Sequence, residues 1–464
     1  MWYRVKACLY FVIFLCASPL LICITLISWL FGSTSRMLKG FKEPARTLEK
    51  LSLRPKFRRT VLVTDGILTK SLHVMRTLAK AGHRIILVQS DQHKYSASSW
   101  SKYVSRTRYV PHYNGKTMDK YIDGVVKVAV EEKVDWFVPI SKAYSAIPNY
   151  MVEQKLAKVC PRIRCLGFGS LEIALLLNDK RRFLSECRRL GLSFPDFRVI
   201  SQVDELYKLR DENLFENHHY FLKPVEDLSE DRNNFRRIPH DLNAFKEYVN
   251  EYEMQITLGR NYFVCEYING SEYCSNVICR NGKILAIQVC PSSSVQIDYD
   301  AIDHKEIEEW TTEFCSKLKI SGGLCFDFIQ DHNNIIYCLE CNPRLHSAIT
   351  TFHCDPKLAV AIQAALEPEH VQDEEVVFPV KPPIHQSLHV YWLYQEVYKL
   401  FTGRQGIREL LSTVLHGKEA VYDHDDPLPF LILYTIHIMF QLKKNILNNA
   451  RWSVVNPCLG RPSY

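Results

Sequence analysis

Two apolar segments near residue 330 constrain the fold of this chain more than any other feature of the sequence. The segments GGLCFDFIQ (322–330) and NIIYCLECN (334–342) are separated only by the polar tripeptide DHN. Both are rich in the β-branched and aromatic residues that favour strands, and so short a connection is typical of an antiparallel hairpin. The sequence therefore predicts a hairpin over 322–342.

The register of this hairpin decides where its charged side chains point. If Gln330 lies opposite Ile335, Asp327 pairs with Cys338. Glu340 then lies one step diagonal to Asp327 on the same face. A shift of one residue would turn every side chain of one strand to the other face.

The second strand adds an amide to this face. Asn342 lies two residues beyond Glu340, so strand alternation puts it beside Glu340 and Asp327. Carboxylate and amide oxygens suit Mg²⁺, which takes oxygen ligands at roughly 2.1 Å and completes its shell with phosphates and water. We therefore predict that Asp327, Glu340 and Asn342 bind Mg²⁺, with Mn²⁺ as an alternative ion. The other interpretation is a pair of exposed acids at a sheet edge.

The N-terminus carries an uncharged apolar run, ACLYFVIFLCASPLLICITLISWLF (7–31), long enough to cross a bilayer as a helix. More positive charges follow the run than precede it, so the positive-inside rule predicts a cytoplasmic body. We expect a hydrophobic membrane segment over 1–35 and a basic linker over 36–58. The alternative is a buried or monotopic hairpin broken at Pro19. The basic residues after the run are Arg36, Lys39, Lys42 and Arg46.

Composition excludes several classes of protein. The 464 residues are 47% hydrophobic, which excludes a disordered chain. The net charge is +7, but no stripe of lysine and arginine interleaved with aromatics indicates nucleic-acid binding. The 16 cysteines are scattered singly through apolar runs, which is typical of a reduced compartment rather than a disulfide scaffold. Cys338 and Cys341 form a CxxC without a second pair, so no zinc site is expected.

The region after residue 58 alternates between strand and helix patterns. RRTVLVTDG, SLHVMRTLAKAGHR and IILVQSD read as a βαβ unit. A further helix and strand follow, so a small doubly wound α/β domain is expected over 59–158. Its first loop lacks the three glycines of dinucleotide sites, which argues against a Rossmann cofactor. Polar loop residues that either contact substrate or are simply solvated are Asp65, Thr69, Lys70, Ser90, Ser141 and Lys142.

The rest of the chain carries coarser signals of secondary structure. A helical stretch over 170–197 ends at Gly191, and strands follow, with a tight turn at RNGK (280–283). The last hundred residues are helical, and PLPFLILYTIHIMFQL (427–442) is short for a membrane span. We expect this run to dock either in the core or on a membrane surface.

A family resemblance joins these signals. The combination of Asp327 with ECNPR (340–344), FLKP (221–224) and CEYINGSEY (265–273) resembles the ATP-grasp ligases. The resemblance implies an α+β ATP-grasp fold with a pre-ATP-grasp domain at 59–158, a two-lobed ATP-grasp domain at 159–360 and a helical C-terminal region at 361–464. It also implies ATP and Mg²⁺ as cofactors.

The resemblance assigns roles by position. Lys180 and Lys223 correspond to the two lysines that reach the nucleotide phosphates. The stretch from Glu266 through Tyr267 to Ile268 corresponds to the hinge that hydrogen-bonds adenine. Glu272 corresponds to the acid that binds ribose.

On the acceptor side, Arg344 corresponds to the arginine at the phosphoryl acceptor. His346 either deprotonates the incoming amine or only hydrogen-bonds in the core. The run 292–294 with Gln296 and Tyr299 is either a polar wall for the acceptor or an ordinary loop.

Several segments, among them ECNPRLHSAIT and YWLYQEVYKL, resemble the ATP-grasp ligases of mycosporine-like amino acid biosynthesis. That implies two small-molecule substrates, a cyclohexenone and an amino acid. One departure is the loop 224–239, which has no glycine, so phosphate contacts there would fall to Arg232, Arg236 or Arg237. The alternatives are a ligase for another carboxylate and amine, and a non-catalytic, membrane-tethered nucleotide-binding protein.

Overall fold

The computed structural model describes residues 58–448 and parts of 5–26. Short gaps in the described region fall at 68, 114–115, 141–145, 225–235, 258–261, 293–296, 371–375 and 385–387. Ser141, Lys142, Arg232 and Gln296 therefore lie outside the described residues. The domain boundaries expected from the sequence stay predictions.

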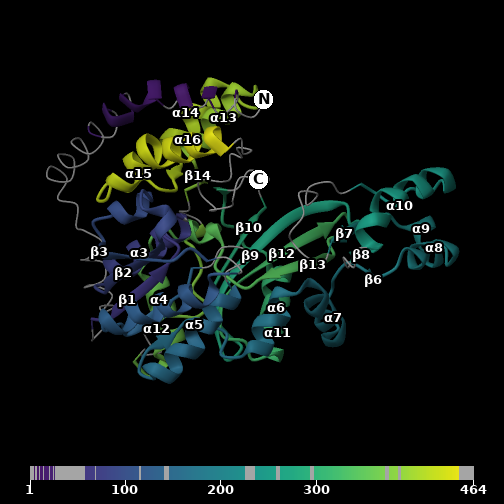
Figure 1. Ribbon diagram of the computed structural model, residues 1–464, viewed down its shortest axis with the longest axis horizontal. Coiled ribbons are helices and arrows are strands. Elements are labelled where there is room, and N and C mark those ends of the chain that lie inside the picture. Colours follow the sequence, from purple (N-terminus) through teal and green to yellow (C-terminus); the bar gives the residue numbers. More distant parts are fainter. Residues whose placement is uncertain are drawn as a thin grey trace.

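The first unit is a parallel sheet with the strand order β3-β2-β1-β4-β5 (Figure 1). Successive side chains of a strand face opposite sides. Val61 and Val63 of β1 therefore share a core with residues of helix α3, whereas Leu62 shares a core with residues of helices α4 and α5. The βαβ unit predicted from the sequence is present, but the charged edge strand β3 was not predicted. The elements are β1 (Thr60–Thr64), α3 (Thr69–Lys80), β2 (Arg84–Ser90), η1 (Asp91–His93), η2 (Ala97–Trp100), β3 (Val104–Val110), α4 (Met118–Glu131), β4 (Trp136–Val138), α5 (Ala146–Val159) and β5 (Arg164–Cys165).

A four-stranded antiparallel sheet of order β10-β9-β12-β13 forms the centre of the molecule (Figure 1). Phe326 and Phe328 pack on helices at one face, and Cys325 faces the first unit. The predicted RNGK turn is present, since both Asn281 and Gly282 have positive φ. The elements are α6 (Leu171–Asn178), α7 (Lys180–Leu190), β9 (Gly270–Arg280), β10 (Lys283–Pro291), α11 (Lys305–Lys317), β12 (Gly322–Asp331) and β13 (Ile336–Asn342).

The helical stretch expected over 170–197 is two helices, not one. Asp179 has an extended backbone and its carboxylate accepts hydrogen bonds from the Arg181 and Arg182 N–H groups, so it caps α7. Lys180 is consequently the first residue of α7. The helix ends at Gly191 in the left-handed conformation, as expected.

A separate lobe projects from this body (Figure 1). It has a three-stranded antiparallel sheet of order β6-β8-β7 with its own core of aromatic and aliphatic side chains. Its elements are β6 (Phe197–Ile200), α8 (Val203–Asp211), α9 (Leu214–Asn217), β7 (Tyr220–Pro224), α10 (Leu242–Thr257) and β8 (Tyr262–Glu266).

The C-terminal region packs back on the first unit and the central sheet. The apolar run 427–442 lies in the shared core through Phe430, Leu433 and Leu442, which matches the core alternative. A small sheet of order β11-β14-β15 joins this region to the chain before α11. The elements are β11 (Asp298–Tyr299), η4 (Ser347–Phe352), α12 (Pro356–Leu366), η5 (Pro368–His370), β14 (Val390–Tyr391), α13 (Leu393–Phe401), α14 (Ile407–His416), β15 (Lys418–Glu419), α15 (Leu428–Ile432), a π-helical turn η7 (Leu433–His437) and α16 (Ile438–Asn448).

The expected N-terminal membrane segment falls largely outside the described residues. Those described between 5 and 26 are helical. In the part of the chain that the structure describes, no helix is both long and apolar enough to span a membrane.

A buried ion pair fastens the C-terminal region to α3. The Arg76 guanidinium lies 3.0 Å from the Asp426 carboxylate, and both side chains are almost fully buried. Arg76 also donates to the Val421 carbonyl, and Ser101 donates to Asp426. Removing one partner would leave an uncompensated buried charge.

We predict that Asp426→Ala lowers the free energy of unfolding by about 3–5 kcal/mol, because it strands the Arg76 charge in the core. Urea unfolding followed by circular dichroism measures this. The matched control is Glu369→Ala, which removes a half-exposed partner of Arg164 and should cost less than about 1 kcal/mol. Equal effects of the two substitutions would contradict a structural role for the Arg76–Asp426 pair.

Candidate functional site

The hairpin β12–β13 brings its two acids face to face. The register pairs Gln330 with Ile336 rather than with Ile335, so the predicted register is wrong by one residue. A bulge between Asp327 and Phe328 then shifts the pairing again, and Asp327 lies directly opposite Glu340. Without the bulge, the observed register would put Asp327 and Glu340 on opposite faces of the hairpin. The bulge returns both carboxylates to the same face.

Asn342 completes this group. Its side-chain Nδ2 donates to Asp327 Oδ2 at 2.9 Å and to Glu340 Oε1 at 3.2 Å. Burial, and then the neighbouring Glu340 charge, raise the pKa of Asp327 to about 7. The structure thus brings together the three residues predicted as metal ligands.

Two cations partly offset this negative charge. Lys180 Nζ lies 2.6 Å from Glu340 Oε2, which places the first residue of α7 at the hairpin. Arg344 is near enough to lower the pKa of Asp327, although no carboxylate of a described residue lies within 4 Å of its guanidinium. The site therefore combines partly buried carboxylates with basic side chains, as a site for a metal bound to phosphate requires.

The donor set fits a hard divalent cation that shares its coordination with a ligand. Two carboxylates and one amide oxygen are too few for a closed protein cage, and no group of three or more His, Cys, Asp or Glu side chains suited to a metal occurs among the described residues. Mg²⁺ commonly takes one or two carboxylates and fills its other positions with water and phosphate oxygens. Rotation of the Asn342 amide would turn its oxygen toward the cation.

Lys180 and Lys223 border the same space between the central sheet and the projecting lobe. Burial raises the pKa of the Cys265 thiol to about 11, and both Lys223 and Lys180 oppose that rise. Lys223 lies on β7 of the projecting lobe, opposite Phe263 of β8, and Lys180 is the first residue of α7.

The hinge predicted at 266–268 connects β8 to β9. The Glu266 and Tyr267 N–H groups donate to the Asp196 and His219 carbonyls. No hydrogen bond of the Ile268 N–H occurs within the described chain, which leaves that group available to a ligand. The Glu266 carboxylate is also occupied, since it accepts from the Asp196 N–H at 3.1 Å.

Glu272 is exposed at the start of β9. It pairs with Ile329, while Cys274 pairs with Asp327, so alternation puts Glu272 on the face that carries Asp327. Glu272 thus lies between the hinge and the hairpin, and its contact to ribose stays a prediction.

His346 lies just beyond the hairpin and is neutral. Burial, with a smaller effect of the Lys70 and Arg344 charges, lowers the pKa of His346 to about 3. Its Nδ1 accepts the Ala348 N–H at 3.2 Å, so the ring proton is on Nε2. His346 thus presents a hydrogen-bond donor rather than a base.

Tyr299 forms a wall beside His346. Their rings lie 5.6 Å apart, and the Tyr299 hydroxyl shares a 2.8 Å hydrogen bond with Ser347. Because β11 pairs with β14, the C-terminal region holds Tyr299 in this place. Of the other residues expected in this wall, 293–296 lie outside the described residues.

Lys70 is a buried cation beside Arg344 that was singled out only as a loop residue. Its Nζ donates to the Leu345 carbonyl at 2.5 Å. Burial, and then Arg344, lower the pKa of Lys70. Its position at the start of α3, near the reversal of strand order between β1 and β4, is the sequence signal that could have placed it in the site.

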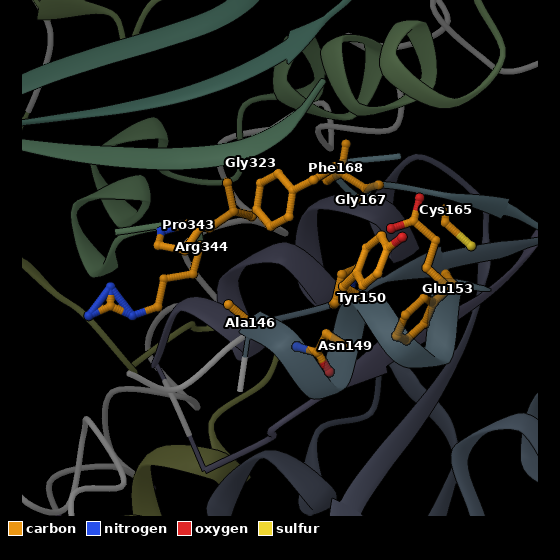
Figure 2. A pocket seen from close by; sticks show the side chains of 14 residues that line it. Ala146, Asn149, Tyr150, Glu153, Cys165, Gly167, Phe168, Gly323, Pro343 and Arg344 are labelled. Carbon is orange, nitrogen blue, oxygen red and sulfur yellow. The ribbon is translucent and has the colours of Figure 1, made fainter. Parts of the chain in front are cut away.

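A small, partly open pocket lies between the first unit and the segment that follows the hairpin. Arg344 and Phe168 border it on one side, and Tyr150 and Glu153 of α5 on the other (Figure 2). Burial raises the pKa of Glu153 to about 7. The Arg344 guanidinium points away from Tyr150 and Glu153 at the other side of the pocket (Figure 2).

The glycine-free loop is described only at its end. Arg237 stacks over the Tyr267 ring at 4.3 Å, and Arg236 pairs with Glu251. Residues 225–235 lie outside the described residues. Two other polar loop residues of the first unit are engaged within the protein. Thr69 is buried, and the Ser90 hydroxyl contacts His112 at 3.1 Å.

Comparison with known proteins gives the fold. No family model matches the sequence, and no curated protein matches it. Among solved structures, an L-amino acid ligase from Bacillus licheniformis matches with a TM-score of 0.51 at 17% identity, covering 70% of this chain and 79% of that one.

Two further structures are biotin carboxylases. The β-γ-ATP complex of the enzyme from Campylobacter jejuni has a TM-score of 0.50 at 19% identity, covering 69% of this chain and 72% of that one. The biotin carboxylase domain of a thermophilic 2-oxoglutarate carboxylase bound to bicarbonate has a TM-score of 0.50 at 15% identity, with the same coverage. These structures are ATP-grasp ligases, and the chain described here has the α/β ATP-grasp fold.

Proposed function

We propose that this protein is an ATP-dependent ligase that forms a carbon–nitrogen bond. The observation that carries the proposal is the convergence of Asp327, Glu340 and Asn342 with Lys180 and Arg344 at the end of one hairpin. Phosphoryl transfer is catalysed mainly by positioning and by neutralising charge, which this set of residues would supply. The similar structures support the assignment, since one of them contains an ATP compound.

In this proposal, ATP lies between the projecting lobe and the central sheet. The Ile268 N–H would bind adenine, Glu272 the ribose, and Lys180 and Lys223 the phosphates. Asp327, Glu340 and Asn342 would hold Mg²⁺, which screens the phosphate charge when bound. Lys180 would then exchange its contact with Glu340 for a phosphate oxygen.

The substrates we propose are 4-deoxygadusol and glycine, which give mycosporine-glycine, ADP and phosphate. The segments SSSVQIDY (292–299), ECNPRLHSAIT (340–350) and YWLYQEVYKL (391–400) resemble those of mycosporine-glycine synthase. The γ-phosphoryl group passes to an enol oxygen of the ring, and the glycine amine attacks the ring carbon. Phosphate then leaves with the electron pair of the broken C–O bond, and the amine loses its proton.

Arg344 and His346 would act on the acceptor. Arg344, with Lys70 behind it, supplies positive charge near the oxygen that receives phosphate. The His346 Nε2–H would donate a hydrogen bond to an acceptor oxygen, which replaces the role of base considered for it from the sequence. We also propose membrane association of the N-terminal segment.

The direct test is ADP release by the full-length protein with Mg-ATP and 4-deoxygadusol, with and without glycine. We expect glycine-dependent release and a new ultraviolet-absorbing product. Asp327→Asn and Glu340→Gln should each reduce release at least about 100-fold, because each removes a charge used for the transferring phosphoryl group. Glu313→Gln, at an exposed position on α11, is the matched control.

If folded protein that still binds Mg-ATP releases no ADP with these substrates, this substrate pair is ruled out. A panel of carboxylates and amines would then be tested. Full activity in both metal-site variants would rule out the metal assignment. A protein that binds ATP but turns over no pair would be the non-catalytic alternative.

A second prediction concerns pH. The raised pKa of Asp327 means that the folded protein binds this proton more tightly than the unfolded chain does, so stability falls as pH rises from about 4 to 7. In EDTA, Asp327→Asn should therefore increase the free energy of unfolding at pH 8 by about 1 kcal/mol or more, since one pKa unit is about 1.4 kcal/mol. The gain should shrink at pH 5.

Urea unfolding at both pH values, with and without Mg²⁺, measures this effect. Mg²⁺ should stabilise the wild type at pH 8 and leave Asp327→Asn unchanged, because the cation offsets the carboxylate repulsion. A variant less stable than wild type at pH 8 in EDTA would show that the Asp327 charge is stabilising and would contradict the account.

A third prediction separates the two roles of His346. A donor role predicts that His346→Gln, which keeps an N–H group, retains at least about tenfold more ADP release than His346→Leu. It also predicts no ionisation of His346 in the pH profile between 5 and 8. Two results together would instead support a general base at His346. The two variants would lose ADP release equally, and the pH profile of the wild type would show an ionisation near pH 6 that both variants lack.

A further inference from the structure

Helix α14 carries an apolar face that the described chain covers only in part, since Leu410 is half-buried and α13 contacts the helix. Its apolar residues recur at i, i+3, i+4, i+7 and i+8, which places them on one side of the helix. None of its residues is buried. Phe401, the last residue of the preceding helix α13, is a further apolar side chain that is 73% exposed. The face consists of Ile407, Leu410, Leu411, Val414 and Leu415, and we call it, with Phe401, the α14 face.

The exposure of these side chains is unusual for a soluble surface. Ile407 is 64% exposed and Leu415 is 74% exposed, and they lie on the same side of a single helix. Isolated exposed leucines are ordinary, but a contiguous apolar patch marks a surface that binds something.

The described residues between 5 and 26, which are helical and are called the N-terminal helix below, present a second apolar surface at the same end of the molecule (Figure 1). Phe11 and Leu21 pack against the core that includes the C-terminal helices, so one side of this helix is anchored to the body. Val5, Leu9 and Val12 on its other side are each more than half exposed. Its sequence from 7 to 31 contains no charged residue, which suits hydrocarbon better than water.

Basic side chains accompany these surfaces. Arg404 and Arg408 are exposed beside the α14 face, and Lys443 and Lys444 are exposed on α16. Glu409 lies on the polar side of α14, where its carboxylate accepts the Gly406 N–H. A second copy of the chain would bring like charges together, whereas anionic headgroups complement them.

We propose that the α14 face and the N-terminal helix together dock onto an anionic lipid bilayer, with α14 lying in the plane of the interface. The ten residues of α14 extend ~15 Å, about half the hydrocarbon thickness, so this helix inserts sideways rather than across. Its apolar side chains enter the acyl region while Arg404 and Arg408 reach the headgroups. This surface is independent of the substrates proposed above.

The test is co-sedimentation of the full-length protein with vesicles of phosphatidylcholine alone or mixed with phosphatidylglycerol. We expect stronger binding to the anionic vesicles, and a loss of at least about tenfold in partitioning for the double variant Leu411→Glu, Leu415→Glu. Leu242→Glu on α10, which is 47% exposed and far from this end, is the matched control. Unchanged binding by the double variant would overturn a role for α14.

Because the N-terminal helix alone could hold the protein on vesicles, a second measurement reports on α14 itself. In Leu411→Trp the new indole should be quenched by lipids brominated on their acyl chains, and in Ser412→Trp, on the polar side, it should not. Equal quenching at the two positions would overturn in-plane docking. The proposal would also be overturned if the wild-type protein did not bind vesicles and instead self-associated through this face, with the double variant monomeric by light scattering.

Discussion

Two partly buried carboxylates that repel each other lie at the centre of this molecule. Asp327 and Glu340 lie directly opposite on adjacent strands, where burial and mutual repulsion raise the pKa of Asp327. Such an arrangement costs stability, so it persists only because Asn342, Lys180 and Arg344 surround it and the flanking strands are fixed by an apolar core. The divalent cation and phosphate that we propose for this site would remove the repulsion.

The same constraint explains why distant parts of the chain meet at the hairpin. Lys180 reaches Glu340 because Asp179 breaks the preceding helix and starts a new one at that point. Lys70 reaches Leu345 from the first unit, and Tyr299 reaches His346 because the C-terminal strand β14 holds β11. The neutral state of His346 follows mainly from its burial, and Lys70 and Arg344 further disfavour a positive charge on its ring.

Much of this arrangement was predictable from local pattern. The βαβ unit, the RNGK turn and the hairpin follow from periodicity and turn residues, which act over a few positions. The bulge at Asp327 does not, because a strand pair with one extra residue has the same composition as a regular one. The register was therefore predicted wrongly by one residue, and the three ligands still converged because the bulge restored the face. Lys70 was underestimated for a related reason: its burial depends on packing between units that are 275 residues apart.

The position of Arg344 has a consequence for how the two halves of the proposed reaction are kept apart. Its guanidinium is close enough to influence Asp327, Lys70 and His346, while its stem borders the pocket next to α5. A side chain with no carboxylate partner among the described residues keeps its charge available for an anion that arrives later. Phosphoryl transfer delivers negative charge to the acceptor oxygen, and the departing phosphate carries that charge away. Arg344 would therefore interact most strongly with the phosphorylated acceptor. The neutral His346 would orient the acceptor through a hydrogen bond. Because His346 carries no charge, it would not bind the phosphate too tightly for release.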